Sequence, residues 1–398
     1  MHSRRRFTAL LSTGALAGCA TAAGPVSPAP KPASPALSLP LQPRGRPLVL
    51  APVHVSEDRV IRTVVGLRPY RSEGFVVRAE KLGDKLVVHN YGHGGGGITL
   101  SWGTSHLAVG LGHDSAVERY AVLGCGAVGL ATARLLQRRG AKVTIYAADL
   151  PPETTSNIAG GQWWPGSVYD FDAATPDFIR QFTLAWRSAY REFQNLVGPH
   201  YGVRWTRNYT PQRAGAVRRV VVAPGGGGPG VPPPPPADPL EGLAPERRTL
   251  EPGEHPFGPV RVSQIDSMMI EPAIYLQAVM EDFLTAGGQI VVRRFQSREQ
   301  LAQLPERTIF NCTGLGARAL FGDEALIPVR GQLVILLPQP EVTYNVLSGG
   351  FYMFPRTDGI VLGGTYERNE WSLQPDVEAT ARVLAGNKAI FDAMTQPG

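Results

Sequence analysis

The 398-residue chain is 43% hydrophobic and 18% charged, which is typical of globular enzymes and excludes a wholly disordered or fibrous protein. Its length predicts two or three domains, and its three cysteines exclude a disulfide-stapled scaffold. The net charge of +6 comes largely from basic residues before position 50, and no basic stripe interleaved with aromatic residues follows, so we expect no nucleic-acid partner.

The first nineteen residues, MHSRRRFTALLSTGALAGC, have the charged start and short apolar run of an export signal. The run is too short to span a bilayer. Residues 3–7 (SRRRF) resemble the twin-arginine consensus of bacteria, and residues 16–19 (LAGC) resemble a lipobox whose cysteine becomes lipidated. We therefore expect an exported, periplasm-facing lipoprotein of the bacterial cell envelope, held at the membrane by a lipid on Cys19. An ordinary signal peptide with coincidental arginines is the alternative.

Residues 20–47 are rich in Ala, Pro and Ser and carry no apolar period. This composition predicts a disordered tether between a lipid and a folded body. The twin-arginine route carries proteins that have already folded, often around a cofactor, so the signal also predicts a bound cofactor.

A glycine-rich stretch, HNYGHGGGGITLSWG (89–103), follows in a region otherwise typical of a β-strand. Six glycines in fifteen residues predict that something approaches this backbone closely. His89 and His93 lie in this stretch with no third ligand nearby, so we interpret both as structural and expect no metal site.

Residues 118–146 have the pattern of a βαβ unit, with strands expected over 120–123 and 142–146 and a helix over 127–138. The turn GCGAVG fits G-x-G-x-x-G, in which the glycines permit a tight turn, the approach of a pyrophosphate and the packing of helix on strand. A merely structural turn is the alternative. Asp149 is the candidate ribose ligand, although it lies slightly late for that role and could be a solvated loop residue. The residues of the turn predicted to contact a dinucleotide are Gly124, Gly126, Ala127, Val128 and Gly129.

The remaining chain alternates helices with short strands, which predicts a nucleotide-type sheet interleaved with a separate antiparallel sheet. A Pro- and Gly-rich run within 223–240 predicts a disordered loop, to which we assign no function. Cys125 and Cys312 lie in tight glycine motifs, so we expect small buried residues without a disulfide. Helices are expected over 175–197, 271–288 and 377–394, and strands over 289–295, 308–314, 329–338, 349–356 and 359–366.

The segment IYAADLPPETTSNIAGGQWWP (145–165) resembles the flavin-wrapping segment of the D-amino-acid oxidase family. FNCTG (310–314), VRGQLV (329–334), YMFP (352–355) and VLGGTYERNEW (361–371) are similar to successive segments of that family in the same order. The resemblance covers 118–398 and implies an α/β fold, in which an FAD-binding Rossmann-like domain, with its βαβ unit in 118–170, is interleaved with an antiparallel-sheet substrate domain in 171–398. It implies FAD as the cofactor.

The family's closing portion resembles a segment near the front of this chain, where VVGLRPYR (64–71) precedes the glycine-rich stretch. The resemblance therefore implies a circular permutant in which 48–113 is a displaced family C-terminal segment and 104–118 is the joining link. Chain termini that lie close together tolerate such a rearrangement. We expect Gly398 to lie near residues 47–60.

The resemblance also assigns residues to the cofactor. The glycine run would hold the pyrimidine edge of the flavin ring, and a glycine-rich hairpin without a ligand is the alternative. Gly96 stands where the family commonly has a bulky residue. The cofactor residues implied are Gly94, Gly96, Gly97, Ile98, Thr99, Thr154, Thr155, Ser156, Gly160, Gly161, Gln162 and Gly314.

Three further residues match the family's substrate site. Arg68 matches the arginine that clamps the substrate α-carboxylate, a role suited to its planar fork, and a structural salt bridge is the alternative. Tyr352 matches a tyrosine that reaches the same carboxylate, and a core tyrosine is the alternative. The Gly95 carbonyl would face the substrate amine. Tyr344 is the candidate for a second pocket tyrosine, and Arg356 and Arg71 are candidates for binding an acidic side chain.

The activity implied is FAD-dependent oxidative deamination of a D-amino acid, with hydride transfer from Cα to flavin. Water would hydrolyse the imino acid to a 2-oxo acid and ammonia, and oxygen would become hydrogen peroxide. The alternatives are a glycine- or sarcosine-type amine oxidase, a quinone-linked dehydrogenase, and a non-catalytic flavin-binding envelope protein.

Overall fold

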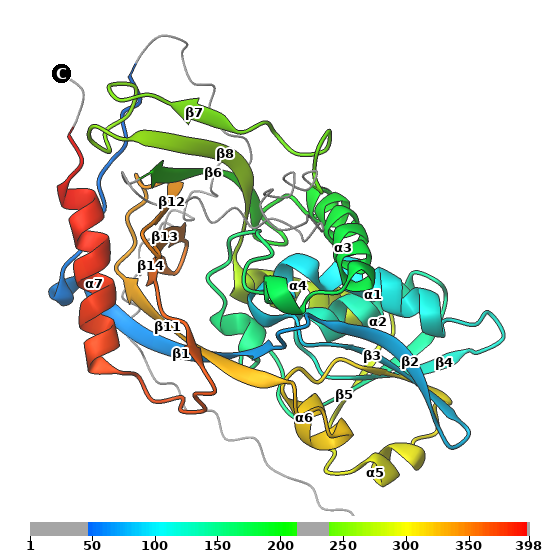
Figure 1. Ribbon diagram of the computed structural model, residues 1–398. Helices are drawn as coiled ribbons and strands as arrows, with labels where there is room; N and C mark the ends of the chain where they lie inside the picture. The colour runs from blue at the N-terminus through cyan, green and yellow to red at the C-terminus, as the bar shows by residue number, and fades with distance from the viewer. Residues whose placement is uncertain (1–46, 213–238, 396–398) are drawn as a thin grey trace, which may run out of the picture. The chain divides into compact units, whose positions relative to one another are not determined.

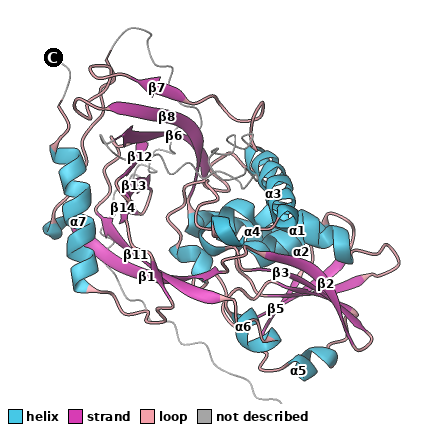
Figure 2. Ribbon diagram, viewed as in Figure 1, coloured by secondary structure: helices cyan, strands magenta, loops and turns pink. Residues whose placement is uncertain are grey.

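Two β-sheets and the helices around them make up the protein in the computed structural model, which describes residues 47–212 and 239–395 (Figures 1 and 2). The described residues belong to one compact unit. The predicted signal (1–19) with Cys19, nearly all of the tether (20–47) and most of the loop (223–240) lie outside the described residues. None of the helices in the described ranges is long and apolar enough to cross a membrane.

The first sheet has six strands in the order β2-β3-β10-β4-β5-β9, and all neighbours are parallel except the β2/β3 pair. Its core confirms the predicted βαβ unit, because β4, α2 and β5 follow one another along the chain at the expected positions. Strands buried on both faces need helices on each side. The strands are β2 (Val76–Leu82), β3 (Lys85–Tyr91), β4 (Arg119–Leu123), β5 (Lys142–Ala147), β9 (Gln289–Val292) and β10 (Thr308–Asn311), and the helices are α1 (Gly97–Gly112), α2 (Ala127–Gln137), α3 (Pro176–Asn195), α4 (Pro272–Thr285), α5 (Arg298–Ala302) and α6 (Gly316–Phe321).

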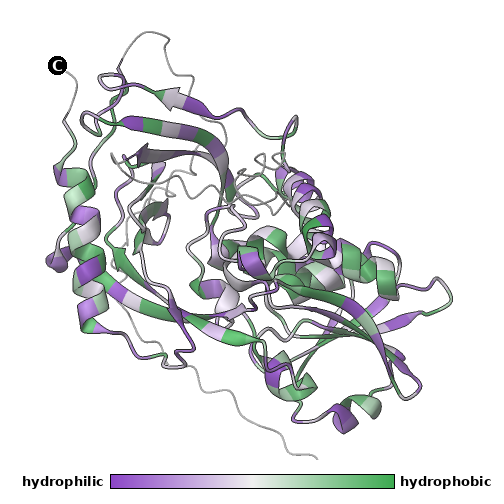
Figure 3. Ribbon diagram, in the orientation of Figure 1, coloured by the Kyte–Doolittle hydropathy of each residue, from purple (hydrophilic) through white to green (hydrophobic). Residues whose placement is uncertain are grey.

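The second sheet has nine strands and is antiparallel except for the β12/β6 pair. Its order is β1-β11-β14-β13-β12-β6-β8-β7, with β15 also paired to β11. Helix α7 (Val377–Asp392) buries its apolar face against this sheet and carries both polar and apolar positions in Figure 3. The strands are β1 (Val60–Tyr70), β6 (Val203–Gln212), β7 (Arg248–Leu250), β8 (Arg261–Ile270), β11 (Ile327–Leu336), β12 (Tyr344–Ser348), β13 (Phe351–Arg356), β14 (Gly359–Gly363) and β15 (Glu367–Arg368).

The glycine-rich stretch differs from its predicted strand-like or hairpin conformation. Strand β3 ends at Tyr91, a 3₁₀ turn covers Gly94–Gly96, and helix α1 begins at Gly97 and occupies most of the expected link. Helix α1 packs between α2 and α3, and a side chain at Gly103 would overlap the carbonyl oxygen of Ala185 in α3. This close packing of two helices, which the local sequence does not reveal, decides the conformation of residues that otherwise favour strand.

The two described ends of the chain share one hydrophobic cluster. Leu50, Val53 and Val55 pack with Val383 and Phe391 of helix α7, and Figure 1 shows the start of the described chain beside this helix. Gly398, for which proximity to residues 47–60 was predicted, lies outside the described residues.

Candidate active site

A cavity of about 780 Å³ lies where the carboxyl ends of β4, β5 and β10 face the antiparallel sheet. This edge is where ligands bind in open α/β sheets, and the volume is typical of cofactor and substrate sites. Of the residues predicted to bind the cofactor or the substrate's carboxylate and amine, all but Gly96 and Gly129 line it: Arg68, Gly94, Gly95, Gly97, Ile98, Thr99, Gly124, Gly126, Ala127, Val128, Asp149, Thr154, Thr155, Ser156, Gly160, Gly161, Gln162, Gly314 and Tyr352.

The turn between β4 and α2 has the conformation that its glycines predict. Gly124 adopts a φ of +102°, and a Cβ there would come within 2.5 Å of the Cys312 carbonyl oxygen. Gly129 does not line the cavity. Its missing side chain lets the first turn of α2 lie directly on the Gly124 carbonyl, which is the packing role predicted for the third glycine.

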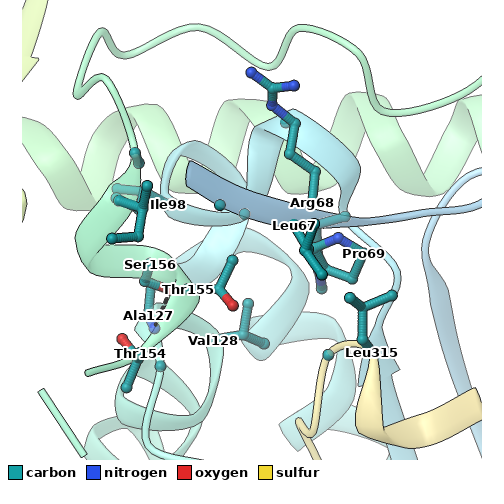
Figure 4. Close-up of a pocket in the computed structure, with 18 of the residues that line it drawn as sticks. Leu67, Arg68, Pro69, Ile98, Ala127, Val128, Thr154, Thr155, Ser156 and Leu315 are labelled. Carbon is teal, nitrogen blue, oxygen red and sulfur yellow. Dashed lines mark hydrogen bonds between the residues drawn. The ribbon is translucent and has the colours of Figure 1, made fainter. Parts of the chain in front are cut away.

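The start of α2 suits a diphosphate group. Its N-cap residue, Gly126, provides no side-chain cap, and Ala127 and Val128 line the cavity. Uncapped amide groups at a helix N-terminus favour anions. Figure 4 shows Thr154, Thr155 and Ser156 grouped beside this turn, and the Ala127 amide donates a hydrogen bond to Ser156 Oγ at 3.1 Å. Hydroxyl groups and open backbone together fit the dinucleotide that the sequence predicts.

Asp149 lies two residues beyond the end of β5 and lines the cavity. Its carboxylate is 3.5 Å from Arg294 Nη2, which also lines the cavity. Asp149 is exposed, so this is a solvated ion pair among the residues that line the cavity, and the role of Asp149 as a ribose ligand stays a prediction.

The glycine run approaches a neighbouring loop of the protein as well as the cavity. The Gly95 amide donates to the Ser167 carbonyl oxygen at 3.0 Å, and a Cβ at Gly94 would overlap that same oxygen. Gly96 does not line the cavity, because it faces Val168, whose Cγ2 would lie 2.7 Å from a Cβ at position 96. The predicted cofactor contact of Gly96 is therefore replaced by packing, and Val168 fills the space of a bulkier residue.

Both histidines of the glycine-rich stretch are buried and bonded within the protein. His93 Nε2 is 2.9 Å from Thr104 Oγ1, and burial lowers the pKa of His93 to about 3, so the ring is neutral. His89 Nδ1 is 3.0 Å from Asn311, and burial lowers its pKa as well. No group of three His, Cys, Asp or Glu side chains in the described ranges is placed to hold a metal ion. Cys125 and Cys312 are buried and unpaired, as predicted.

Arg68 extends from β1 between Leu67 and Pro69, as Figure 4 shows. Its guanidinium lies over Gly331 of β11, where a Cβ would come within 2.5 Å of Cζ, and Nη1 donates to the Thr365 carbonyl oxygen at 3.4 Å. Within the described part of the chain no carboxylate pairs with it. An arginine that faces a cavity without a carboxylate partner has guanidinium N–H groups available to bind a ligand.

Tyr352 of β13 lines the same side of the cavity. Its ring stacks on Phe354 with centroids 4.7 Å apart, and it lies over Gly363, where any side chain would overlap it. The hydroxyl makes no hydrogen bond to any residue that the structure describes, which leaves it available to a ligand.

Three further candidates for the substrate pocket, Tyr344, Arg356 and Arg71, lie away from the cavity, so their predicted roles are wrong. Tyr344 is buried in β12, and its hydroxyl donates to the Ala51 carbonyl oxygen at 2.6 Å. Arg356 donates to Asp358 and to the Ala159 carbonyl oxygen. Arg71 pairs with Asp323 and Glu73.

Tyr366 lines the cavity and was not predicted, although it lies within the quoted motif VLGGTYERNEW. Its ring centroid is 6.0 Å from Arg68 Cζ and 5.7 Å from Arg368 Cζ. Arg368 is fixed by two hydrogen bonds to Asp170, at 3.0 and 2.6 Å. The Tyr366 ring thus lies near two guanidinium groups, those of Arg68 and Arg368.

The fold and the cavity define a dinucleotide-binding oxidoreductase, with a nucleotide site on the parallel sheet and a free arginine on the antiparallel sheet. The DAO family profile, described as FAD dependent oxidoreductase, matches residues 119–397, and the chain belongs to this family. It is therefore an FAD-dependent enzyme, and the glycine turn and hydroxyl cluster described above fit that cofactor.

Curated relatives are similar over most of their length. The chain is 30% identical to a D-amino-acid oxidase of Streptomyces coelicolor over 268 residues, which are 66% of this chain and 74% of the relative. It is 28% identical to human D-aspartate oxidase over 275 residues, covering 67% and 74% of the two chains. Among solved structures, glycine oxidase from Geobacillus kaustophilus superposes with a TM-score of 0.50 at 14% identity, covering 70% of this chain and 81% of that one. That likeness shows the fold.

Proposed function

We propose that the protein oxidises a D-amino acid to a 2-oxo acid and ammonia while oxygen is reduced to hydrogen peroxide. The observation that carries this proposal is the Arg68 guanidinium, which faces the cavity with no carboxylate partner among the described residues. Bound FAD supplies the acceptor for two electrons. The names of the relatives, D-amino-acid oxidase and D-aspartate oxidase, support the same class of substrate.

The residues of the chain bind and orient the substrate. Arg68 donates two parallel hydrogen bonds to the α-carboxylate, a geometry that a lysine does not reproduce. The Tyr352 hydroxyl donates a third bond, and the Gly95 carbonyl oxygen accepts one from the substrate amine. No side-chain base is required, because a deprotonated amine already carries the lone pair that drives the loss of hydride from Cα. Catalysis then depends on orientation and on the electrostatics of the site.

The test uses protein that begins at residue 47, with its flavin content measured first. We expect D-amino acids to bleach the flavin absorbance without air, and oxygen to restore it with release of peroxide. Arg68→Ala should raise KM by about 100-fold while the flavin content stays constant. Arg78→Ala is the matched control, because that arginine is 63% exposed on β2. Flavin that no D-amino acid bleaches would refute the proposal.

The same experiment distinguishes the proposed activity from its alternatives. Bleaching by glycine or sarcosine in preference to D-amino acids indicates the amine oxidase alternative. Reoxidation by a quinone but not by oxygen indicates the dehydrogenase. Full flavin content with no bleaching by any amine indicates a non-catalytic flavin protein.

We also propose that the chain is a circular permutant of its family. The family match begins at residue 119, and strands β1 and β3 from the preceding segment lie beside β11 and β10 of the matched region. The hydrophobic cluster in which residues 50–55 pack with helix α7 also supports the proposal, because it brings the two described ends of the chain together. A reordered chain that runs from 119 to 395, through a short glycine linker, and on from 47 to 118 should fold and bind FAD. Its failure to fold would contradict the permutation.

The twin-arginine lipoprotein signal remains a proposal about localisation. Full-length protein produced in a bacterium should fractionate with the envelope and incorporate labelled fatty acid at Cys19. Cys19→Ser should abolish the label, and replacement of Arg4 and Arg5 by lysine should retain the protein in the cytoplasm. Export without labelling would indicate an ordinary signal peptide.

A further inference from the structure

The wall of the cavity beside Arg68 is built from one face of the antiparallel sheet. Side chains alternate along a strand, so Gly331 and Leu333 of β11 share a face, as do Tyr352 and Phe354 of β13. All four line the cavity. Leu347 lies directly opposite Tyr352 on β12 and lines the cavity as well. Apolar side chains therefore share this face of the sheet with Tyr352, in the cavity that Arg68 also lines.

The apolar wall continues into the sheet as a hydrophobic cluster, while Gln162, Thr365 and Tyr366 add uncharged polar groups elsewhere in the cavity lining. Leu333 and Phe354 are almost fully buried and belong to one hydrophobic cluster, against which Leu347 and Tyr352 pack. Ile158, which follows the hydroxyl cluster, also lines the cavity and lies against Gly66 of β1. A ligand group that contacts this wall exchanges water for aliphatic and aromatic carbon.

Arg68 is the one cationic side chain that the antiparallel sheet contributes to the lining, among the residues that the structure describes. The other charged side chains in the lining, Asp149, Glu153, Arg293 and Arg294, follow strands β5 and β9 of the parallel sheet, at the nucleotide end.

Other arginines of the antiparallel sheet are already engaged. Arg356 binds Asp358 and the Ala159 carbonyl oxygen, Arg204 binds Glu271, and Arg330 binds Glu367. None of them lines the cavity. Among the described residues, a second carboxylate on a substrate would thus find no free cation at this wall.

We infer that the substrate is a D-amino acid with a neutral, apolar side chain, and that acidic D-amino acids are rejected; this inference rests on the proposed function. Burying a second carboxylate against Leu333, Leu347 and Phe354 without a cation leaves an uncompensated charge. An aliphatic side chain of the same shape gains from the same contact. The relatives named D-amino-acid oxidase and D-aspartate oxidase leave this choice open, and the wall decides it.

D-leucine, D-asparagine and D-aspartate have side chains of nearly the same shape, so they separate charge from size. We expect kcat/KM for D-leucine to exceed that for D-aspartate by at least about 100-fold, with D-asparagine between them. Equal or higher efficiency with D-aspartate overturns the inference.

A variant adds the missing cation. Leu347→Arg places a guanidinium at the wall and should raise kcat/KM for D-aspartate relative to D-leucine by about 10-fold or more. Leu347→Met is the matched control, because it keeps the size and the apolar character, and it should leave the ratio unchanged. Equal shifts in both variants would overturn the inference, because the loss of leucine and not the added charge would then set the preference.

Ligand binding separates this inference from the proposed reaction. The flavin spectrum of the holoenzyme is titrated with 4-methylpentanoate and with succinate, which are D-leucine and D-aspartate without the amino group. We expect the monocarboxylate to bind at least about 10-fold more tightly. Tighter binding of 4-methylpentanoate with no oxidation of any D-amino acid would support the apolar wall and refute the proposed function. Succinate binding as tightly, or neither acid binding, overturns the inference.

Discussion

Replacement of Gly331 by alanine tests the proposed role of Arg68 as the ligand of the substrate carboxylate. The new methyl group would come within 2.5 Å of Cζ and 2.6 Å of Nη1 of Arg68, whereas ordinary van der Waals contacts begin at 3.4 Å. The guanidinium must therefore move by about 1 Å, which it can do because it ends a flexible side chain. Gly331 lies in strand β11, where alanine is compatible with the backbone.

A displacement of this size is large for a bidentate contact. A misplacement of about 1 Å costs about 100-fold in rate, and we expect that loss in kcat/KM for a D-amino acid. The free energy of unfolding should change by less than about 1 kcal/mol, because the displaced guanidinium can move into the solvated cavity. Flavin content should stay constant, since Gly331 lies on β11 in the antiparallel sheet and the β4–α2 turn follows a strand of the other sheet.

The assay is steady-state peroxide release, with flavin absorbance and urea unfolding measured on the same preparations. Gly110→Ala is the matched control, because a methyl group at that exposed position of α1 meets no atom within 4 Å. In an Arg68→Ala background, Gly331→Ala should cause no further loss. Unchanged kcat/KM in the single variant would show that Arg68 is not the carboxylate ligand, and an equal loss of flavin would show a structural role.

Three further predictions concern the cofactor turn, the response to acid and the thiols. Gly129→Ala should abolish FAD retention on gel filtration, because its methyl group overlaps the Gly124 carbonyl and pushes α2 away from β4; retention at the wild-type level would contradict this packing. Hydrogen bonding to His106, and then to Arg138, lowers the pKa of Glu192 to about 2. The ionised carboxylate therefore stabilises the folded state fully above an unfolded pKa of about 4.5, and this contribution is lost as the pH falls toward 2. Glu192→Gln should therefore reduce the urea unfolding free energy by about 1 kcal/mol at pH 7 and by much less near pH 3, and a constant difference would refute the assignment. Burial raises the pKa of Cys125 and Cys312 to about 12, so neither thiol should react with a maleimide at pH 7 in folded Cys19→Ser protein, whereas both should react in urea.

The sequence alone predicts much of the nucleotide half of the fold. The βαβ unit, helix α3 with its Thr175 cap, and helix α4 lie within a few residues of their predicted bounds, because each combines a clear period with a glycine or capping signal. Helix α1 was missed. Its glycine and β-branched residues favour other conformations, and its stability comes from burial against α2 and α3, which lie farther along the chain.

The predicted site residues likewise divide into those that line the cavity and those that do not. Residues identified by a continuous motif, such as Gly124 and Ser156, line the cavity as expected. Candidates chosen for residue type alone do not. Arg356 binds Asp358 in the adjoining turn and the Ala159 carbonyl oxygen, and Tyr344 binds the carbonyl oxygen of the distant Ala51. Gly96 shows a third case, in which a position within a motif packs against a loop whose path depends on the whole fold.

Strand β1 carries Arg68 in one sheet, and 26 positions later the same segment carries Gly94 at the edge of the other. On the proposed function, one contiguous stretch of the chain therefore encodes both substrate recognition and part of the cofactor contact. Residues 60–112, exchanged as one piece, would carry both sets of contacts together.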